Sequence, residues 1–299
     1  MELRHLRYFL VLAEEMNFTR AADRLMIAQP PLSRQIKDLE EELGTPLFVR
    51  GHHLLELTEE GALFRDYASR ILSLADQSVA EIQDMGSGLQ GTLYLAEVEG
   101  KGPHLMSQWI SGFSKLYPGV QFSLWNGNSD EVVNRIHKGL GDIGLIMEPY
   151  DPKGIHSLKV YSEPWVAMIP ADHPLAAKAS NTISMKELRA CDLIIPSRDS
   201  RLREISDQMA PYGATPHVKA KIANVLTAYE LCKAGVGVAI YPAAAADIVS
   251  DPNKVVIKTI ADKGIRASYV LIYSDAHPLQ HIAQKFIEYI HEQGADMVS

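Results

Sequence analysis

The sequence predicts an α/β protein with a helical N-terminal region, one long helix and a larger region of alternating strands and helices. Apolar residues recur at helical spacing from Leu3 to Met85. After Gly86-Ser87-Gly88 the pattern changes to short apolar runs that alternate with helical patterns, which is typical of a parallel sheet covered by helices. The 299 residues suffice for more than one domain.

Composition and charge restrict the function classes. Hydrophobic residues make up 46% and charged residues 22% of the chain, as in ordinary globular proteins. The formal net charge of −8 argues against coating a polyanion, and residues 1–57 carry seven Lys/Arg against nine Asp/Glu. The N-terminus is charged from its start, and no apolar run has membrane-spanning length. We therefore expect a cytoplasmic protein with no membrane partner.

The two cysteines, Cys191 and Cys232, have neither metal-ligand nor redox spacing. We expect buried, inert thiols, and a redox sensor remains the alternative.

Residues 18–48 predict two short helices joined by a tight turn. Thr19 is the expected cap of the first helix, and Ala22 is small where the two helices must cross closely. The second helix begins at Gln29, because Pro30 and Pro31 are tolerated in a first turn. Its apolar stripe ends at a glycine and consists of Leu32, Ile36, Leu39 and Leu43. This pattern is typical of a helix-turn-helix, whose second helix enters the DNA major groove.

The opposite face of this second helix carries side chains that recognise DNA. Gln29 and Ser33 can bind base edges, Arg34 can bind guanine with two hydrogen bonds, and Lys37 suits a phosphate. An ordinary amphipathic hairpin with a solvated face is the alternative interpretation.

Two β-prone runs, 47–50 and 55–57, follow and predict a hairpin wing. Its tip, Gly51-His52-His53, together with Arg50, would reach the DNA backbone or minor groove. Adjacent histidines in a turn seldom bind one metal ion, so we expect no metal. The predicted DNA-binding residues are Thr19, Arg20, Gln29, Pro30, Pro31, Ser33, Arg34, Lys37, Arg50, His52 and His53.

These N-terminal motifs resemble one known family. In order and spacing, MELRHLRYFLVLAEEMNFTRAADRL, AQPPLSRQIKDLEEELG, PLFVR and LTEEG are similar to the DNA-binding domain of LysR-type transcriptional regulators, most of all the branch that activates aromatic-compound catabolism. The resemblance covers roughly the first sixty residues. It implies a homotetramer that binds operator DNA, activates a neighbouring operon and has RNA polymerase as a candidate partner.

The next segment, residues 58–88, predicts a long helix with a coiled-coil seam. A single helix cannot bury such a stripe alone, so we expect a homodimer, with packing on the chain's own second domain as the alternative. The predicted interface residues are Phe64, Ala68, Ile71, Ala75, Ser78, Ile82 and Met85, with Leu74 and Val79 beside them.

Residues 89–299 predict two α/β lobes. Lobe I comprises 89–162 and 268–299, and lobe II comprises 163–267. The DNA-binding domain that precedes them comprises residues 1–57. Two lobes with two crossings resemble the periplasmic-binding-protein-like effector domain of the same family. Ligands of such sheets bind at the carboxyl ends of strands, here between the lobes.

Those strand ends supply the candidate effector-binding residues. They are Glu99, Gly100, Lys101, Gly102, Asn126, Asn128, Glu148, Ser197, Arg198, Arg201 and Asn224. Helix N-termini and basic side chains favour anions, so an organic acid is the expected small-molecule effector. The family often has Ser or Thr hydroxyls in the first loop, whereas this chain has Glu99 and Lys101. Solvated loop residues of an ordinary α/β domain are the alternative for each position.

No motif predicts an enzyme or a cofactor. Gly86-Ser87-Gly88 lacks the Lys-Ser/Thr of a phosphate loop, and His277 and His281 enclose no acidic general base. No catalytic residue is assigned. The alternative function is a cytoplasmic small-molecule-binding protein or enzyme in the two-lobe region, with the N-terminal hairpin serving assembly only.

Overall fold

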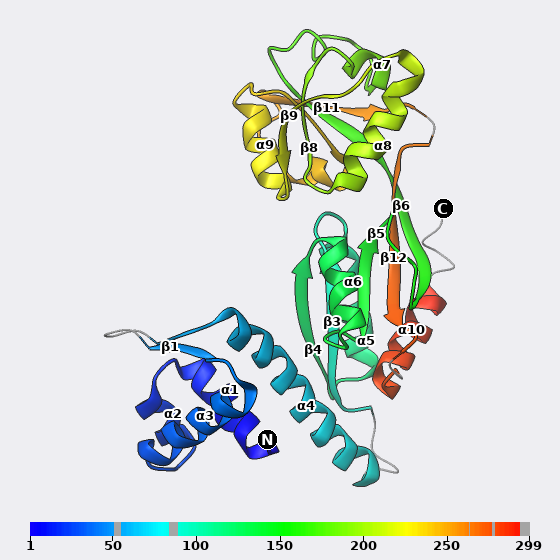
Figure 1. The fold of residues 1–299 in the computed structure, drawn as a ribbon. Coiled ribbons are helices and arrows are strands. Elements are labelled where there is room, and N and C mark those ends of the chain that lie inside the picture. The colour runs from blue at the N-terminus through cyan, green and yellow to red at the C-terminus, as the bar shows by residue number, and fades with distance from the viewer. Residues whose placement is uncertain (51–54, 84–88, 263, 277–278, 294–299) are drawn as a thin grey trace. The chain divides into compact units, whose positions relative to one another are not determined.

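The computed structural model describes every residue except 51–54, 84–88, 263, 277–278 and 294–299 (Figure 1). The chain divides into two compact units, Met1–Thr92 with Tyr117–Gln121, and Leu93–Leu116 with Phe122–Ser299. Helices and strands are mixed as the sequence predicts. None of the helices described is both long enough and apolar enough to cross a bilayer.

The first unit is mainly helical. Its elements are α1 (Leu3–Glu15), α2 (Phe18–Arg24), α3 (Gln29–Leu43), β1 (Phe48–Arg50), β2 (Leu55–Leu57) and α4 (Glu59–Gln83). One apolar core joins these helices, and its fully buried side chains include Leu6, Phe9, Leu12, Ala21, Leu32 and Ile36. The pair β1–β2 is the predicted hairpin, with Phe48 opposite Leu57 and Arg50 opposite Leu55. The hairpin's tip lies outside the described residues.

The helix ends follow from local chemistry, with one correction. Pro30 and Pro31 occupy the first turn of α3, and Gly44 ends the helix at φ +72°, a conformation that favours glycine. The cap of α2, however, is Asn17 and not Thr19. The Asn17 side chain accepts hydrogen bonds from the backbone N–H groups of Thr19 (2.9 Å) and Arg20 (3.0 Å).

Helix α4 corrects part of the predicted dimer seam. Ala68 is fully buried, and the ring of Phe64 packs edge-on against Phe9 at 4.9 Å between centroids, so both belong to the unit's own core. Ile71 and Ser78 are exposed and Ala75 is half-buried. The side chain of Ile82 and the whole of Met85 lie outside the described part.

The second unit alternates strands and helices. Lobe I contains β3 (Gly91–Val98), α5 (Gly102–Leu116), β4 (Val120–Gly127), α6 (Ser129–His137), β5 (Ile143–Met147) and α10 (His281–Gln293). Lobe II contains β7 (Thr182–Ile183), α7 (Met185–Leu188), β8 (Asp192–Pro196), α8 (Asp199–Met209), η1 (Ala210–Tyr212), β9 (His217–Ile222), α9 (Val225–Lys233), β10 (Val238–Pro242), η2 (Ala243–Ile248) and β11 (Val255–Ile260).

Two antiparallel strands, β6 (Ile155–Pro170) and β12 (Arg266–Ser274), run between the lobes (Figure 1). The first part of β6 pairs with β12, and its last residues pair with β10 and β11 of lobe II. The sheet order is β4-β3-β5-β12-β6-β10-β8-β9. Strands β3–β5, β8–β9, β8–β10 and β7–β11 are parallel, whereas the pairs that include β6 or β12 are antiparallel. The expected parallel arrangement therefore holds away from these two connecting strands.

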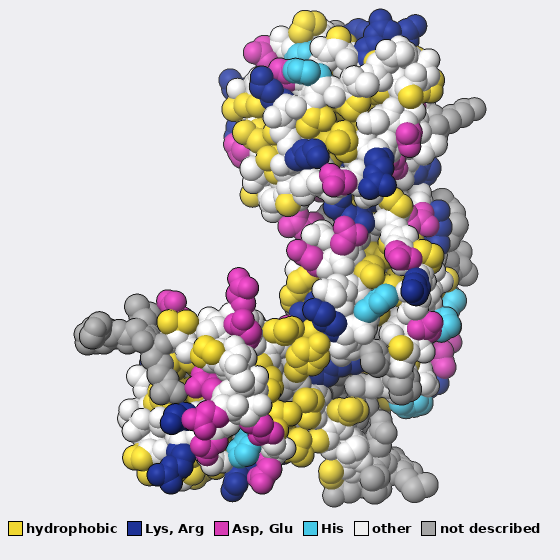
Figure 2. Space-filling model, viewed as in Figure 1, with side chains coloured by type: hydrophobic (Ala, Val, Ile, Leu, Met, Phe, Trp, Pro, Cys, Tyr) yellow, Lys and Arg dark blue, Asp and Glu magenta, His cyan; other side chains and the backbone are white. Residues whose placement is uncertain are grey.

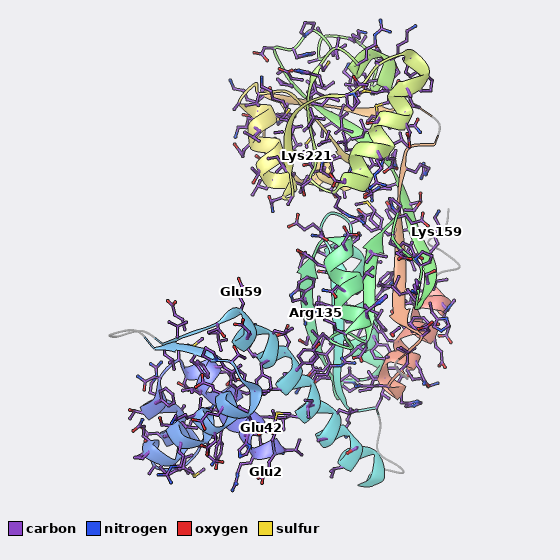
Figure 3. All side chains as sticks on the ribbon, viewed as in Figure 1. Glu2, Glu42, Glu59, Arg135, Lys159 and Lys221 are labelled. Atoms are coloured by element: carbon purple, nitrogen blue, oxygen red, sulfur yellow. The ribbon has the colours of Figure 1, made fainter. Side chains whose placement is uncertain are left out.

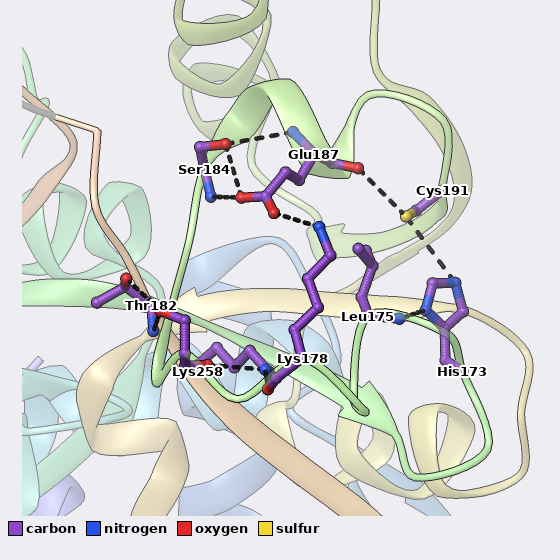
Figure 4. A network of polar contacts seen from close by, with 9 residues as sticks. His173, Leu175, Lys178, Thr182, Ser184, Glu187, Cys191 and Lys258 are labelled. Atoms are coloured by element: carbon purple, nitrogen blue, oxygen red, sulfur yellow. Dashed lines mark hydrogen bonds and ion pairs between the residues drawn. The ribbon is translucent and has the colours of Figure 1, made fainter.

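A polar network supports the edge of lobe II (Figure 4). Glu187 pairs with Lys178 at 2.5 Å and accepts hydrogen bonds from Ser184, and these contacts lower the pKa of its carboxyl to about 2. The buried ammonium of Lys258 donates to the backbone carbonyls of Lys178 (2.5 Å) and Ser180 (2.8 Å). Burial also raises the pKa of both cysteine thiols, that of Cys232 to about 12. Both cysteines are therefore buried thiols, as expected.

Phe9 is the core residue whose loss should harm the first unit most. Replacement of Phe9 by Ala should lower the free energy of unfolding by about 3–5 kcal/mol, because a fully buried ring leaves a cavity. Urea unfolding followed by circular dichroism measures the change. The control is Val49→Ala, since Val49 is 54% exposed in the same unit. Equal stability of the two variants would contradict the placement of Phe9.

Candidate functional site

The N-terminal half of α3 presents the predicted DNA-binding face. Gln29, Pro30 and Pro31 are exposed, and Ser33 is half-buried. Arg34 is exposed and forms no ion pair with any residue that the structure describes. Lys37 pairs with Glu41 one turn later, at 3.2 Å. The free guanidinium of Arg34 is thus the group on this face most available to a base edge or phosphate.

The other predicted DNA contacts are less well defined. Thr19 is exposed at the start of α2, and the Arg20 guanidinium lies 3.5 Å from the Glu15 carboxylate. Arg50 lies in β1, but its side chain is outside the described part, as are His52 and His53 entirely. The structure therefore brings together the α3 residues and leaves the wing contacts as predictions.

Acidic residues at the end of α3 have structural partners that the sequence did not indicate. The Glu40 carboxylate accepts hydrogen bonds from the backbone N–H groups of Leu47 (2.8 Å) and Phe48 (3.1 Å) and thereby fixes the start of the wing. Glu42, at the far end of α3, binds the amino group of Met1 at 2.6 Å (Figure 3). These carboxylates are engaged at the end of α3 opposite to Arg34.

A cavity of about 330 Å³ lies in the second unit at the carboxyl ends of β3, β4, β5 and β8. Pocket volumes for small ligands begin at about 300 Å³, so this one suits a compact metabolite. Seven predicted residues line it, namely Glu99, Gly100, Asn126, Asn128, Ser197, Arg198 and Arg201. Its other lining side chains are mostly apolar, among them Val98, Met147, Pro196, Val225, Tyr241, Pro242, Ala245 and Tyr269.

Four predicted residues are not part of the cavity lining. Lys101 lies beside it, where its backbone N–H donates to the Tyr269 hydroxyl at 3.2 Å. Gly102 is buried at the start of α5. Glu148 accepts a hydrogen bond from Arg201 through its backbone carbonyl. Asn224 caps α9 and donates to Glu99 at 3.4 Å.

The two arginines of the cavity already have partners. Arg198 forms two hydrogen bonds with Asp130 of α6, at 3.0 and 2.6 Å, and so joins lobe II to lobe I. Arg201 is 1% exposed, binds Glu204 at 2.6 Å and lies 5.5 Å from the Trp165 ring. Burial lowers the pKa of its guanidinium, and Glu204 counteracts this. The two arginines that we expected to help bind an organic acid therefore already have partners within the protein.

Sequence reasoning missed a group of buried polar residues near the cavity. Glu97 lies in β3 and is 6% exposed. Its side chain accepts a hydrogen bond from the side chain of Asn126, which lines the cavity. Its Oε2 atom has no hydrogen-bond partner among the described residues. Burial raises the pKa of Glu97 to about 7. The available signal was an acidic residue inside an otherwise apolar strand, Leu93–Val98.

Tyr269 and Glu163 form a second buried pair that the sequence did not reveal. The Tyr269 hydroxyl donates to Glu163 at 3.0 Å, and Glu163 also accepts from the backbone N–H of Ala244 at 3.1 Å. Burial raises the pKa of both side chains. In the part of the chain that the structure describes, no three His, Cys, Asp or Glu residues are grouped so as to hold a metal ion.

Comparison with known proteins decides what these two sites belong to. Residues 3–62 match the family model "Bacterial regulatory helix-turn-helix protein, lysR family", and residues 86–295 match "LysR substrate binding domain". The chain belongs to the LysR family. It is a DNA-binding transcriptional regulator with an effector-binding domain.

Relatives in the LysR family agree with this assignment. The chain is 34% identical over 246 residues to the uncharacterized HTH-type transcriptional regulator YnfL of Escherichia coli (strain K12), covering 81% of this chain and 82% of that one. It is 35% identical over 247 residues to the regulator CatR of Pseudomonas putida, covering 81% and 83%. Both relatives are named as regulators and not as enzymes.

A solved structure extends the similarity to nearly the whole chain. Full-length CbnR complexed with its target DNA matches with a TM-score of 0.72 and 25% identity, covering 98% of this chain and 99% of that one. The chain described here thus shares the fold of CbnR, a regulator whose complex with DNA has been solved. The predicted fold class is confirmed.

Arg34 provides a direct test of the DNA-binding face. Replacement of Arg34 by Ala should cost about 1–3 kcal/mol of specific binding and relax specificity at one base position. Lys37→Ala should instead weaken binding to all sequences alike and reduce the salt slope by about one. Fluorescence anisotropy on operator and scrambled duplexes measures both. Wild-type discrimination in the Arg34 variant would remove Arg34 from the reading face.

Glu97 provides a test through pH. Its pKa rises from an ordinary 4.5 to about 7 on folding. Between these values the folded protein keeps a proton that the unfolded chain has lost, so this residue makes the free energy of unfolding fall as pH rises. Glu97→Gln should remove that decline, so the stability gain over wild type should grow between pH 5 and 7 and level off above about 8.

Urea midpoints at a series of pH values measure the effect. Glu288→Gln is the control, because Glu288 is a surface carboxylate that pairs with Lys285. A constant difference between wild type and Glu97→Gln across this range would show that Glu97 titrates normally.

Proposed function

We propose that the protein binds a two-fold symmetric operator as a homodimer or homotetramer and that a small molecule in the cavity changes its DNA contacts. The observation that carries this is the combination of an exposed Arg34 on α3, without an ion-pair partner among the described residues, with a cavity at the strand ends of the second unit. The same proposal includes activation of a neighbouring operon with RNA polymerase as partner. Because its target is the bacterial chromosome, it works in the cytoplasm.

The exposed face of α4 supports the homodimer. Leu63, Ile71 and Leu74 are 42%, 37% and 55% exposed, and they share one helical face beside the buried face of Ala68 and Leu72. Exposed apolar side chains in a continuous stripe are typical of an interaction surface. A second copy of α4, which brings the same stripe, is a partner that could cover it in a symmetric way.

Contacts between the lobes support regulation through the cavity. Arg198 and Asp130 join lobe II to lobe I at its edge, and Asn224 and Glu99 do so at another point. A ligand among these residues must contact both lobes, so it favours one lobe arrangement over another. A coupling free energy arises only if the two arrangements bind the ligand with different affinity.

A footprint tests the function as a whole. The purified chain, on DNA upstream of its own gene at physiological salt with nonspecific competitor, should protect a two-fold symmetric site. Addition of a saturating effector should change the length or pattern of that protection. A folded dimer that protects no site with or without effectors would overturn the proposed function.

The α4 surface gives a separate prediction. Leu74→Glu should convert the dimer to monomer, because a charge in an apolar interface is desolvated without a partner, and it should lower operator affinity by roughly tenfold or more. Sedimentation velocity measures the assembly state, and circular dichroism checks the fold. The matched control is Glu60→Gln on the same helix. A Leu74→Glu protein that remains dimeric would assign the interface elsewhere.

A further inference from the structure

The chemistry of the cavity walls determines which effector can bind there. The inference about the effector rests on the proposed function, in which a small molecule binds in this cavity. The relevant properties are the pairing of the cations, the number of carboxylates and the polarity of the remaining walls.

The two arginines that line the cavity already have partners within the protein. Arg198 is held by Asp130, and Arg201 is held by Glu204 and by the backbone carbonyl of Glu148. A carboxylate ligand would have to displace one of these partners. At Arg201, which is 1% exposed, this exchange is unfavourable, because the half-buried carboxylate of Glu204 would lose its cation.

Carboxylates, in contrast, exceed the cations around the cavity. Glu99 and Glu131 line it, Asp130 and Glu204 accompany the two arginines, and Glu97 lies behind Asn126. Figure 2 shows acidic side chains gathered on the visible face of the second unit where the two lobes meet. Arg198, Arg201 and Lys101, which lies beside the cavity, balance three of these five carboxylates, and the excess remains negative.

One of these carboxylates has an oxygen atom without a donor. Glu97 is 6% exposed, and its Oε2 atom has no hydrogen-bond partner among the described residues. Its hydrogen bond from Asn126 connects it to the cavity wall. Buried polar atoms are nearly always paired, so an unpaired oxygen beside a cavity indicates a missing donor. Glu99, two residues further along and just past the end of β3, lines the same cavity, and the hydrogen bond that it accepts from Asn224 is long, at 3.4 Å.

We propose that the effector carries a protonated nitrogen group on a compact apolar body. The nitrogen group donates to Glu99 on the lobe I wall, beside Asn126 and the Glu97 carboxyl that lies behind it. The apolar body packs against Val98, Met147, Tyr241 and Tyr269, whose faces complete the cavity. Aromatic rings beside a cation add a favourable electrostatic contribution. An alkyl or arylalkyl primary amine, whose nitrogen is protonated at neutral pH, has this combination of groups.

Matched pairs of probes test the inference with the full-length protein. Benzylamine is compared with phenylacetate, cyclohexylamine with cyclohexanecarboxylate, and pentylamine with hexanoate, by thermal shift and then by isothermal titration calorimetry. At least one amine should raise the melting temperature and bind at least tenfold more tightly than its carboxylate partner. If no amine binds, or if the carboxylates bind more tightly, the proposal is wrong.

Variants locate the binding group. Glu99→Gln and Glu97→Gln should each weaken amine binding about tenfold or more, whereas Glu288→Gln on α10 should leave it unchanged. Circular dichroism confirms that each variant is folded. Amine binding that persists undiminished in both cavity variants would place the amine elsewhere and overturn the proposal.

Failure here is distinguishable from failure of the proposed function. Carboxylate binding that depends on Arg198 or Arg201, together with an altered footprint, would keep the cavity as the effector site and refute only the nitrogen group. Loss of operator protection under every condition would refute the proposed function itself. An amine that binds through Glu97 and Glu99 and also alters the footprint would support both.

Discussion

The arrangement of the effector-binding unit depends on the pairing of β6 with β12. These two strands connect the lobes, and the buried hydrogen bond from Tyr269 to Glu163 lies where their pairing passes toward lobe II. Tyr269 also accepts from the backbone N–H of Lys101 in lobe I, while Glu163 accepts from that of Ala244 in lobe II. One chain of hydrogen bonds therefore runs from the first-lobe loop through both connecting strands to the second lobe. Because buried polar groups are costly when unpaired, these hydrogen bonds fix the loop, the two strands and the second lobe relative to one another.

The shape of the cavity depends on these same hydrogen bonds. Tyr269 is part of the cavity wall, so the group that connects the strands also faces the ligand. Gly100 lies so close that a Cβ atom there would stand 3.0 Å from the Tyr269 hydroxyl, which explains a glycine at a positive φ in this loop. A ligand in the cavity thus contacts the element on which the lobe arrangement depends. This is the physical requirement for coupling between a ligand and a change in shape, since the ligand must interact differently with the two arrangements.

Local patterns predicted the helix-turn-helix well and the cavity only in part. The stripe of Leu32, Ile36 and Leu39 determines α3 by itself, and the prolines determine where it begins. Strands β9 and β11 were not predicted, because a segment such as His217–Ile222 mixes lysines with short apolar residues at a sheet edge. Periodicity also does not show what covers the apolar stripe of α4, of which Phe64 and Ala68 pack in the core of the first unit. Arg198 binds Asp130, 68 residues away in sequence, and Arg201 donates to the backbone carbonyl of Glu148, 53 residues away. No local pattern indicates these two contacts.

The acidic balance of the first unit illustrates how placement decides function. Its carboxylates are largely engaged in structure: Glu40 fixes the start of the wing, Glu42 binds the N-terminal amino group, and Glu15 pairs with Arg20 and Arg24. A carboxylate with a donor has less effect on an approaching phosphate than a free one, because its field is partly cancelled nearby. Arg34 has no such partner among the described residues and stands at the end of α3 far from Glu42. An acidic chain can therefore present a positive group to DNA without a basic composition, and it must obtain specificity from few contacts repeated in each copy rather than from total charge.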